Sequence, residues 1–394
     1  MDEATETRHR ALRAEMLLDR TVVFLNHGSF GACPRPVFET YQAWQLELER
    51  QPVAFLGRRL PELLAHARAE LAAYVSADAD ELVYFPNVTA ALNAVAHSLP
   101  LAGDDEVLIT NHEYGALWRT WTYVCEQRGA RLVTAHLPRP LDDPCAAVEA
   151  VWACVTPRTR VLFMSHIASP TGVILPIAPL IARARAAGIW TVIDGAHAPG
   201  QIDLDLHALG ADFYGANLHK WLGAPKGAGF LYARPEVQPL VEPPIISWGW
   251  RPVDPSGSAF VDQLQQQGTR DPAAYLAVPA AIAYQAERDW PRVRQECHAL
   301  AVHARNRVAQ LTSAEPVVIG EDATWFGQMA ALPLPACDVD ALRSRLYSAF
   351  KIEIPAWLWQ DRPLLRLSVQ GYNTRADVDC LIAALADELP RVRH

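Results

Sequence analysis

Two short segments hold the residues with the most distinctive chemistry. Lysine occurs only three times in 394 residues, and one of the three is Lys220, in the segment NLHKW at 217–221. Upstream of it, Asp194 directly follows the apolar run at 190–193. A lysine amine can hold an aldehyde as a Schiff base, and a carboxylate can keep a pyridine nitrogen protonated. Together these are the two groups that pyridoxal phosphate (PLP) chemistry requires.

The positions of both residues suit this chemistry. Asp194 would lie at the carboxyl end of a buried strand, where open α/β sheets place their ligands. A carboxylate is costly to bury there without a cationic partner, which a protonated pyridine ring would supply. The alternative is an aspartate that caps the following turn. Burial beside a cationic cofactor would lower the pKa of Lys220 and keep its amine reactive.

A second lysine, Lys226, lies in the glycine-rich segment at 223–229. That segment matches neither of the common nucleotide-binding glycine patterns, so Lys226 fits a surface lysine before a turn. A phosphate needs backbone N–H groups at a helix start together with hydroxyl groups. The segment NVTAALN at 87–93 offers both, although an Asn or Thr that merely caps a helix is common.

The pattern of the chain between residues 80 and 235 predicts an α/β fold. Short apolar runs alternate with amphipathic stretches of helical length, which is typical of a mainly parallel sheet covered by helices. We expect seven strands at 82–84, 106–110, 131–134, 161–165, 190–193, 213–216 and 229–232. We expect the intervening helices near 89–98, 116–127, 145–153 and 177–187.

The two ends of the chain differ from this pattern. A short extended run at 21–25 leads into the loop NHGSFG at 26–31, and helices are expected at 35–49 and 61–75. A proline-rich crossover at 235–255 follows the last strand, and then a long helical pattern at 272–311, short strands and a final helix at 376–389. We therefore predict an N-terminal arm at 1–20, a large PLP-binding domain at 21–265 and a small α+β domain at 266–394.

Composition excludes several classes of protein. The net charge of −9 is spread along the chain without a basic block, which argues against nucleic acid as a partner. The seven cysteines are scattered and show no C-x-x-C spacing, which fits a reduced cytoplasm and argues against a structural zinc site. No segment has the roughly 20 apolar residues that cross a bilayer, and the first twenty residues lack a signal core. We expect a cytoplasmic enzyme without membrane contact.

Taken in chain order, seven segments carry a resemblance to a known family: NVTAALN, NHEYGA, SHIASPTG, DGAHAPG, NLHKW, GTRD and RLSVQGYNT. They resemble the class V aminotransferases of the fold-type I PLP-dependent enzymes, and in particular the isopenicillin N epimerase-like branch. The resemblance covers roughly residues 20 to 385, and DGAH followed by HKW carries most of its specificity. It implies the fold-type I architecture and PLP as the cofactor.

The resemblance also implies roles around the cofactor. Lys220 would form the Schiff base, Asp194 would pair with the pyridine nitrogen, and His197 would lie near the ring hydroxyl. Tyr114 would stack on the pyridine face, although a lone Tyr at a helix start is as often an ordinary core residue. The residues implied for the phosphate are Thr89, the backbone at Val88, Asn217 and His219, and in such dimers Thr269 reaches the phosphate of the partner subunit. A homodimer would then be the functional unit.

Substrate residues are implied in the same way. Arg366 corresponds to the arginine that clamps the substrate α-carboxylate, a task that suits the guanidinium geometry. Asn26, His27 and Ser29 would face the substrate from the N-terminal loop. Four tryptophans near loops could line the entrance and favour a bulky side chain, or could simply pack between domains: Trp248, Trp250, Trp357 and Trp359.

The reaction type stays open among several fates of a carbanion at Cα. Desulfuration needs a nucleophilic cysteine on a loop before the carboxylate arginine, and the segment 351–360 has none, while Cys337 lies too far upstream. We favour epimerisation or racemisation, with Lys220 as acid and base and with Tyr114, His27 or water as the second proton donor. The alternatives are C–S or other β-elimination and true transamination. An inactive PLP-fold binding protein is disfavoured by the intact set of Asp194, Lys220 and Arg366.

Overall fold

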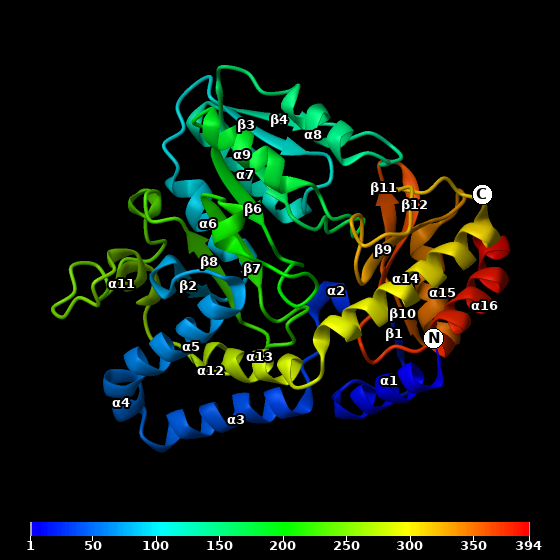
Figure 1. Cartoon of the computed structure of the whole chain (residues 1–394), viewed down its shortest axis with the longest axis horizontal. Coiled ribbons are helices and arrows are strands. Elements are labelled where there is room, and N and C mark those ends of the chain that lie inside the picture. The colour runs from blue at the N-terminus through cyan, green and yellow to red at the C-terminus, as the bar shows by residue number, and fades with distance from the viewer. Residues whose placement is uncertain (1, 394) are drawn as a thin grey trace.

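A seven-stranded sheet forms the centre of the computed structural model, which describes residues 2–393. Its strands are β2 (Leu82–Phe85), β3 (Glu106–Thr110), β4 (Arg131–Ala135), β5 (Thr159–Ser165), β6 (Trp190–Asp194), β7 (Phe213–Asn217) and β8 (Gly229–Ala233). Their order is β2-β8-β7-β6-β5-β3-β4, and β8 alone runs in the direction opposite to the other six strands (Figure 1). The predicted mainly parallel sheet of seven strands is thereby confirmed.

Helices cover both faces of this sheet because the strands are apolar on both sides. Along β5, Val161 and Phe163 pack into one cluster of buried side chains, while Leu162 and Met164 pack into the other. The first cluster includes α6 (Val88–Ser98), α7 (Gly115–Arg128) and α11 (Ala259–Gln265). The second includes α5 (Leu60–Val75), α8 (Pro144–Trp152), α9 (Ile177–Ala186) and α13 (Val278–Ala286). The predicted helices between the strands are therefore present.

The C-terminal part combines a small sheet with three long helices (Figure 1). The antiparallel order is β11 (Ala356–Trp359), β12 (Arg362–Ser368), β9 (Met329–Pro333). The helices are α14 (Trp290–Thr312), α15 (Val339–Phe350) and α16 (Arg375–Val392). A short strand from the other end of the chain, β1 (Val23–Phe24), pairs in parallel with β10 (Ile352–Glu353). This strand therefore joins the C-terminal part, while the predicted domain limits remain a prediction.

The N-terminal segment contains more helix than expected. Residues 3–15 form α1 (Glu3–Glu15), whose first turn is capped by the Asp2 carboxylate at 2.9 Å from the Thr5 N–H. The remaining helices before β2 are α2 (His27–Phe30), α3 (Arg35–Arg50), α4 (Pro52–Ala54) and a π-helix at Phe55–Arg59 that leads into α5. Short helical turns also occur at Ala79–Glu81, α10 (Leu206–Leu209) and Gln238–Leu240.

The helical pattern at 272–311 is divided into three helices rather than one. They are α12 (Ala273–Leu276), α13 and α14, and the break before α14 falls at Asp289, whose φ is +49°. That left-handed conformation interrupts a helix because a right-handed α-helix requires a φ near about −60°. The change of direction sends α14 away from the large sheet and onto the small one (Figure 1).

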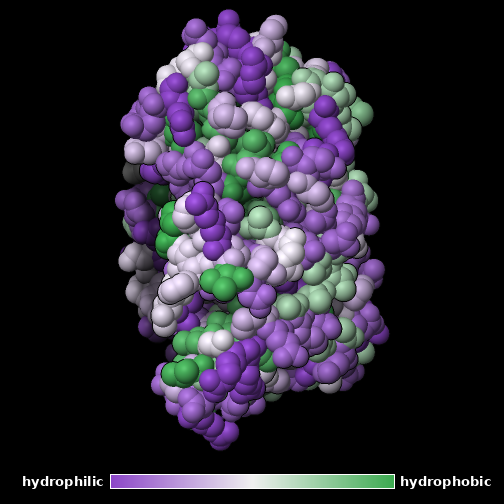
Figure 2. All heavy atoms as spheres, turned by 90° about the vertical axis from the view of Figure 1, so that its left-hand side faces the viewer, coloured by the Kyte–Doolittle hydropathy of each residue, from purple (hydrophilic) through white to green (hydrophobic). Residues whose placement is uncertain are grey.

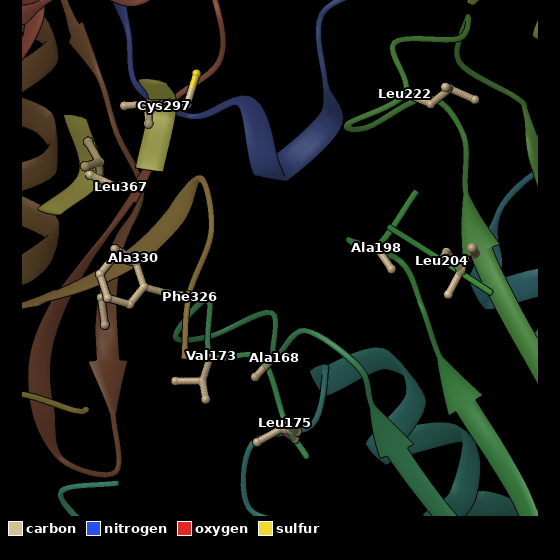
Figure 3. Close-up of a cluster of buried hydrophobic side chains, with 14 of the residues drawn as sticks. Ala168, Val173, Leu175, Ala198, Leu204, Leu222, Cys297, Phe326, Ala330 and Leu367 are labelled. Carbon is tan, nitrogen blue, oxygen red and sulfur yellow. The ribbon is translucent and has the colours of Figure 1, made fainter. Parts of the chain in front are cut away.

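A continuous apolar core joins the two parts of the molecule. Figure 3 shows buried side chains from the loop after β5, such as Ala168 and Val173, beside Ala330 of β9 and Leu367 of β12. Because these side chains pack in one cluster, the loops at the carboxyl ends of the large sheet are held against the small sheet. Within residues 2–393, no helix is long and apolar enough to cross a membrane.

Candidate active site

A cavity of about 830 Å³ opens at the carboxyl ends of β5, β6 and β7, and side chains from both parts of the chain line it. Most of the residues that the sequence predicted for the site meet here: Ser29, Val88, Thr89, Tyr114, Asp194, His197, Asn217, His219, Lys220 and Arg366. Asn26, His27 and Thr269 do not line this cavity.

Asp194 is the last residue of β6 and is almost fully buried. Its Oδ1 accepts a hydrogen bond of 2.9 Å from the Ala196 N–H, and among the described residues no hydrogen bond reaches Oδ2. Burial raises the pKa of Asp194 to about 6, against the opposing influence of the Ala196 N–H and of Lys220. A buried carboxylate with a free oxygen fits a cationic ring nitrogen, because such a partner would restore the ionised form.

Lys220 lies three residues beyond the end of β7 and faces the same cavity. Its Nζ is 3.2 Å from Nε2 of His197. Desolvation, followed by the positive charge of Arg366, lowers the pKa of Lys220 to about 7, and the Asp194 carboxylate opposes this shift. At neutral pH a large share of Lys220 is therefore a free amine, which is the form that attacks an aldehyde.

The amino-terminal end of α6 forms one corner of the cavity. The Asn87 side chain caps this helix by accepting from the Ala90 N–H at 2.9 Å, and the Val88 N–H donates to Oδ1 of Asn217 at 2.9 Å. Asn217 thus occupies the Val88 N–H, and the assignment of this backbone group to the phosphate remains a prediction. Among the described residues no acceptor engages the Thr89 N–H, so Thr89 is the group of the helix start that remains available for an anion.

His219 borders the same corner in a defined protonation state. Its Nδ1 lies 3.1 Å from the carbonyl oxygen of Ala228, so Nδ1 carries the proton and donates it. Burial lowers the pKa of His219 to about 4, which leaves Nε2 as a lone pair at neutral pH. His219 can therefore donate to a phosphate from Nε2 only if the phosphate charge itself promotes protonation.

Arg366 extends from β12 into the cavity, and its hydrogen bonds hold the guanidinium in an orientation that can bind an anionic group. One terminal nitrogen donates to the Ser169 carbonyl at 2.6 Å and to its hydroxyl at 3.3 Å, and the other donates to the Ser29 hydroxyl at 3.0 Å. The guanidinium carbon lies 5.2 Å from the ring centre of Trp357. The buried Nε has no hydrogen-bond partner among the described residues, and the nitrogen that donates to Ser29 has a second N–H, so two donors remain for a ligand carboxylate.

Asn26 and His27 support the site from behind. Nε2 of His27 donates to the Lys220 carbonyl at 3.0 Å, and Nδ1 accepts from the Tyr372 hydroxyl at 2.9 Å. Asn26 accepts from the Ser29 hydroxyl at 2.5 Å and donates to Glu353 at 3.1 Å. The polar atoms of Asn26 and His27 are thus engaged with other protein groups, and neither residue lines the cavity. Their assignment to the substrate remains a prediction.

Tyr114 and Thr269 occupy different surroundings. Tyr114 precedes α7, is 43% exposed and lines the cavity. Thr269 is exposed and lies in a separate groove that also includes Leu56 and Trp248. Its assignment to the cofactor of a partner subunit remains a prediction. Of the four tryptophans, Trp357 and Trp359 line the cavity, and Trp248 and Trp250 do not.

Two groups of the site were missed from the sequence. Ser169 holds Arg366, and Ser165 lines the cavity beside Asp194 and donates to the buried carboxylate of Glu113 at 2.7 Å. Both serines lie in the segment SHIASPTG, so their place in that motif was the available signal. Glu113 lies next to Tyr114 in NHEYGA, and its burial could not be read from that position alone.

Comparisons with known proteins agree on one family. The family model for class-V aminotransferases matches residues 34–381. The chain is 40% identical to an isopenicillin N epimerase from Amycolatopsis lactamdurans over 95% of this chain and 97% of that protein. It is 30% identical to a putative L-cysteine desulfhydrase from Oryza sativa subsp. japonica, over 93% of this chain and 85% of that protein.

A solved structure supports the same architecture. A mutant of the protein C-DES, with glycine covalently linked to its PLP cofactor, superimposes with a TM-score of 0.79. The match covers 93% of this chain and 97% of that chain at 20% sequence identity. This similarity shows the fold, which is the fold-type I arrangement that the sequence predicted.

Proposed function

The chain belongs to the class-V aminotransferase family and is a PLP-dependent enzyme, and from this premise we propose that it is an epimerase or racemase. The proposed reaction inverts Cα of an amino acid or of an amino-acid-derived substrate. The observation that carries the proposal is the convergence of Asp194, the Lys220 amine and the Arg366 guanidinium, whose Nε has no partner among the described residues, on one cavity. Because a relative with 40% identity is an isopenicillin N epimerase, isopenicillin N is the first substrate to test.

When bound, PLP supplies an electron sink that stabilises negative charge at Cα. In our proposal the Asp194 carboxylate holds the pyridine nitrogen in its protonated form, which accounts for a buried carboxylate without a second partner. Arg366 binds the substrate carboxylate through its free Nε–H and so fixes the direction of the Cα–H bond. Lys220 then takes the Cα proton, since its pKa of about 7 suits a base at neutral pH.

Inversion also requires a proton donor on the other side of Cα. His27 is disfavoured because both of its ring nitrogens are engaged with protein groups. We assign this role to the Tyr114 hydroxyl, because Tyr114 lines the cavity and is 43% exposed. Lys220 and Tyr114 would then exchange protons with Cα from two sides.

The cysteines do not favour a desulfurase. None of the seven cysteines lines the cavity. Cys337 is buried, and its backbone pairs with that of Arg393 in an isolated β-bridge. Burial raises the pKa of the Cys337 thiol, so it is a poor nucleophile. A persulfide-forming route has no sulfur to receive the product of C–S cleavage within the described site.

A second candidate is β-elimination from a sulfur-containing amino acid. The similarity to the rice protein named as an L-cysteine desulfhydrase favours this alternative, because it also covers most of the chain. The same carbanion would expel a substituent at Cβ instead of regaining its proton. Release of pyruvate and sulfide from cysteine would identify this reaction.

The proposal is tested with the PLP-loaded enzyme in deuterated water. We expect exchange of the Cα hydrogen and loss of optical purity of the substrate, without release of keto acid or sulfide, first with isopenicillin N and then with a panel of amino acids. Absence of Cα exchange with all substrates would contradict the proposal.

The variant Tyr114→Phe should retain exchange of one enantiomer but lower the rate of inversion by roughly 10²-fold or more, the usual effect of losing an acid or base. Equal loss of exchange and inversion would show that Tyr114 is not the second proton donor.

A further inference from the structure

His197 contacts Lys220 on one side and a tryptophan on the other. Its Nε2 is 3.2 Å from the Lys220 Nζ, and its Nδ1 is 3.1 Å from the indole nitrogen of Trp221. Both His197 and Trp221 are buried. The two ring nitrogens thus face two different groups, and the chemistry of the tryptophan decides the state of the ring.

An indole N–H can only donate a hydrogen bond. The nitrogen that receives it, Nδ1 of His197, must therefore have a lone pair and no proton. A neutral imidazole carries its single proton on the other nitrogen, so Nε2 is an N–H group. The doubly protonated ring is excluded as long as the Trp221 bond is present.

We propose that Trp221 fixes His197 as a neutral imidazole with its proton on Nε2, so that His197 presents a hydrogen-bond donor to Lys220 and to the bound cofactor. Trp221 is then a positioning residue, which acts through His197. The inference rests on Lys220 as the lysine that binds PLP, as proposed above.

The surroundings prevent the indole from turning away. Gln285 donates to the Trp221 carbonyl at 2.8 Å and to the Leu222 carbonyl at 3.1 Å. At Gly200 an added Cβ would lie only 2.4 Å from the Trp221 carbonyl carbon, so the chain at Gly200 packs directly against this backbone. The His27 ring lies 4.9 Å from the indole, centre to centre. These contacts hold the Trp221 backbone in place, and the complete burial of its side chain restricts rotation of the indole.

The electrostatic environment agrees with a neutral ring. Burial lowers the pKa of His197 well below its usual value, and the charge of Lys220 lowers it further. An N–H aimed at Nζ in turn favours the free amine of Lys220, because an ammonium group has no lone pair to accept it. If Nε2 carried a lone pair instead, it would accept from the ammonium and stabilise the charged form. The proton position on His197 therefore affects how readily Lys220 reacts.

The direct test is the ¹⁵N NMR spectrum of the wild-type apoenzyme, labelled in its histidine side chains. His197 is assigned from the signal that disappears in His197→Gln. We expect a protonated Nε2 and an unprotonated Nδ1 that do not titrate between about pH 5 and 9. A proton on Nδ1, or titration of the ring in this range, would overturn the proposal whatever reaction the enzyme catalyses.

The variant Trp221→Phe removes the N–H and keeps an aromatic ring. We expect the pH midpoint for capture of added PLP by the apoenzyme, followed by absorbance, to rise by about 1 unit, since Nε2 can then accept from the Lys220 ammonium. The matched control is Trp121→Phe, which alters another fully buried tryptophan, in the separate apolar cluster around α6 and α7, and should leave the midpoint unchanged. An equal shift in both variants would mean a packing effect and would overturn the proposal.

A double-mutant cycle isolates the path through His197. In the His197→Gln background an amide donor replaces the imidazole, and its N–H does not depend on a tautomer. Trp221→Phe should then shift the midpoint by less than about 0.3 units, which is close to additivity error. The same shift in both backgrounds would show that Trp221 acts by another route. If Trp221→Phe does not fold, the wild-type NMR spectrum decides alone.

Discussion

Lys220 differs from the other two lysines in its surroundings. Lys226 also borders the cavity, but its Nζ donates to the Gly31 carbonyl at 3.0 Å, whereas Lys351 is exposed and follows α15. Only Lys220 combines a depressed pKa near neutrality with a place between Asp194 and Arg366. The rarity of lysine makes this difference easy to test.

We predict that reduction of the PLP-loaded enzyme with borohydride will attach the cofactor to Lys220 alone, as located by peptide mass spectrometry. Lys220→Ala should lose the absorbance band of lysine-bound PLP and slow Cα exchange by about 10³-fold or more, because it removes both the amine and the base. Lys351→Arg serves as the control and should keep the band and the rate. Attachment at Lys226 would refute the assignment.

Arg366 tests substrate recognition separately from cofactor binding. Arg366→Lys keeps the charge but loses the planar fork, so we expect KM for a carboxylate substrate to rise roughly 10- to 100-fold while the PLP band stays unchanged. The control is Arg362→Lys on the same strand, since Arg362 pairs with Glu315 at 2.7 Å outside the cavity. A change in KM of similar size in both variants would mean that Arg366 does not bind the substrate.

At the level of elements, Glu113 connects two strands of the large sheet. Its carboxylate accepts from the Thr110 hydroxyl at the end of β3, and from the N–H and hydroxyl of Ser165 at the end of β5 at 2.8 and 2.7 Å. Burial raises the pKa of Glu113 from 4.5 to about 7 in spite of these donors. The folded chain thus binds a proton here that the unfolded chain releases at lower pH.

This linkage gives a stability prediction with a defined sign. A carboxyl group with a raised pKa in the folded state stabilises the fold fully below pH 4.5, and this contribution is lost as pH rises through 7. Over the difference of 2.5 pH units it amounts to at most about 3 kcal/mol. Glu113→Gln should therefore lose less stability than the wild-type apoenzyme between about pH 5 and 8, as measured by urea unfolding. An identical pH dependence in both proteins would contradict the shifted pKa.

Elements with strong local patterns could be predicted, and those set by distant contacts could not. The seven strands of the large sheet are short apolar runs, and their positions differ from the prediction by at most two residues at an end. In contrast, the extended run expected at 21–25 gave no sign that β1 would pair with β10, more than three hundred residues away. The break at Asp289 depends on one backbone conformation inside an unbroken amphipathic pattern. Tertiary contacts decide such cases, because local propensity is nearly neutral there.

The candidate site shows the same division. Asp194 and Lys220 follow apolar strands and could be located from the sequence, because strand ends meet at one edge of a parallel sheet. His27 lies in a motif that looks exposed, yet its ring is buried under the Lys220 carbonyl. The position of a residue in a motif predicted that it lies near the cavity, but it did not predict which of its atoms face the cavity. The Trp221 contact to His197 likewise required the folded geometry.

On the scale of the whole molecule, the cavity depends on how the two parts of the chain meet. Arg366 comes from β12, and its partners Ser29 and Ser169 come from α2 and from the loop after β5. The buried cluster in Figure 3 spans the same junction, so packing holds these three segments in register. Movement of the small sheet would displace the substrate-binding group relative to Lys220.

Apolar side chains are also exposed outside the cavity. The crossover after β8 exposes several of them, including Ile245, Ile246, Trp248 and Val253, with Trp248 at 84%. Figure 2 shows the side of the molecule on which α11 lies, where green apolar groups interrupt the polar surface. Thr269 lies in a groove with Trp248, close to this surface. Exposed apolar groups of this kind mark interfaces, which supports our proposal of a homodimer in which Thr269 serves the partner's cofactor.

The homodimer is tested by complementation between two defective variants. Lys220→Ala lacks the cofactor-binding lysine, and Thr269→Asp places a negative charge against the phosphate of the neighbouring site. Each protein alone should be inactive or bind PLP weakly. In a mixed dimer, however, Lys220 of the Thr269→Asp chain meets the intact Thr269 of the Lys220→Ala chain. Refolding an equal mixture should therefore restore about a quarter of the wild-type sites, because half of the dimers are mixed and each has one complete site. If Thr269 instead acted within its own chain, one site of a mixed dimer would lack Lys220 and the other would contain the aspartate. Mixing would then restore no activity.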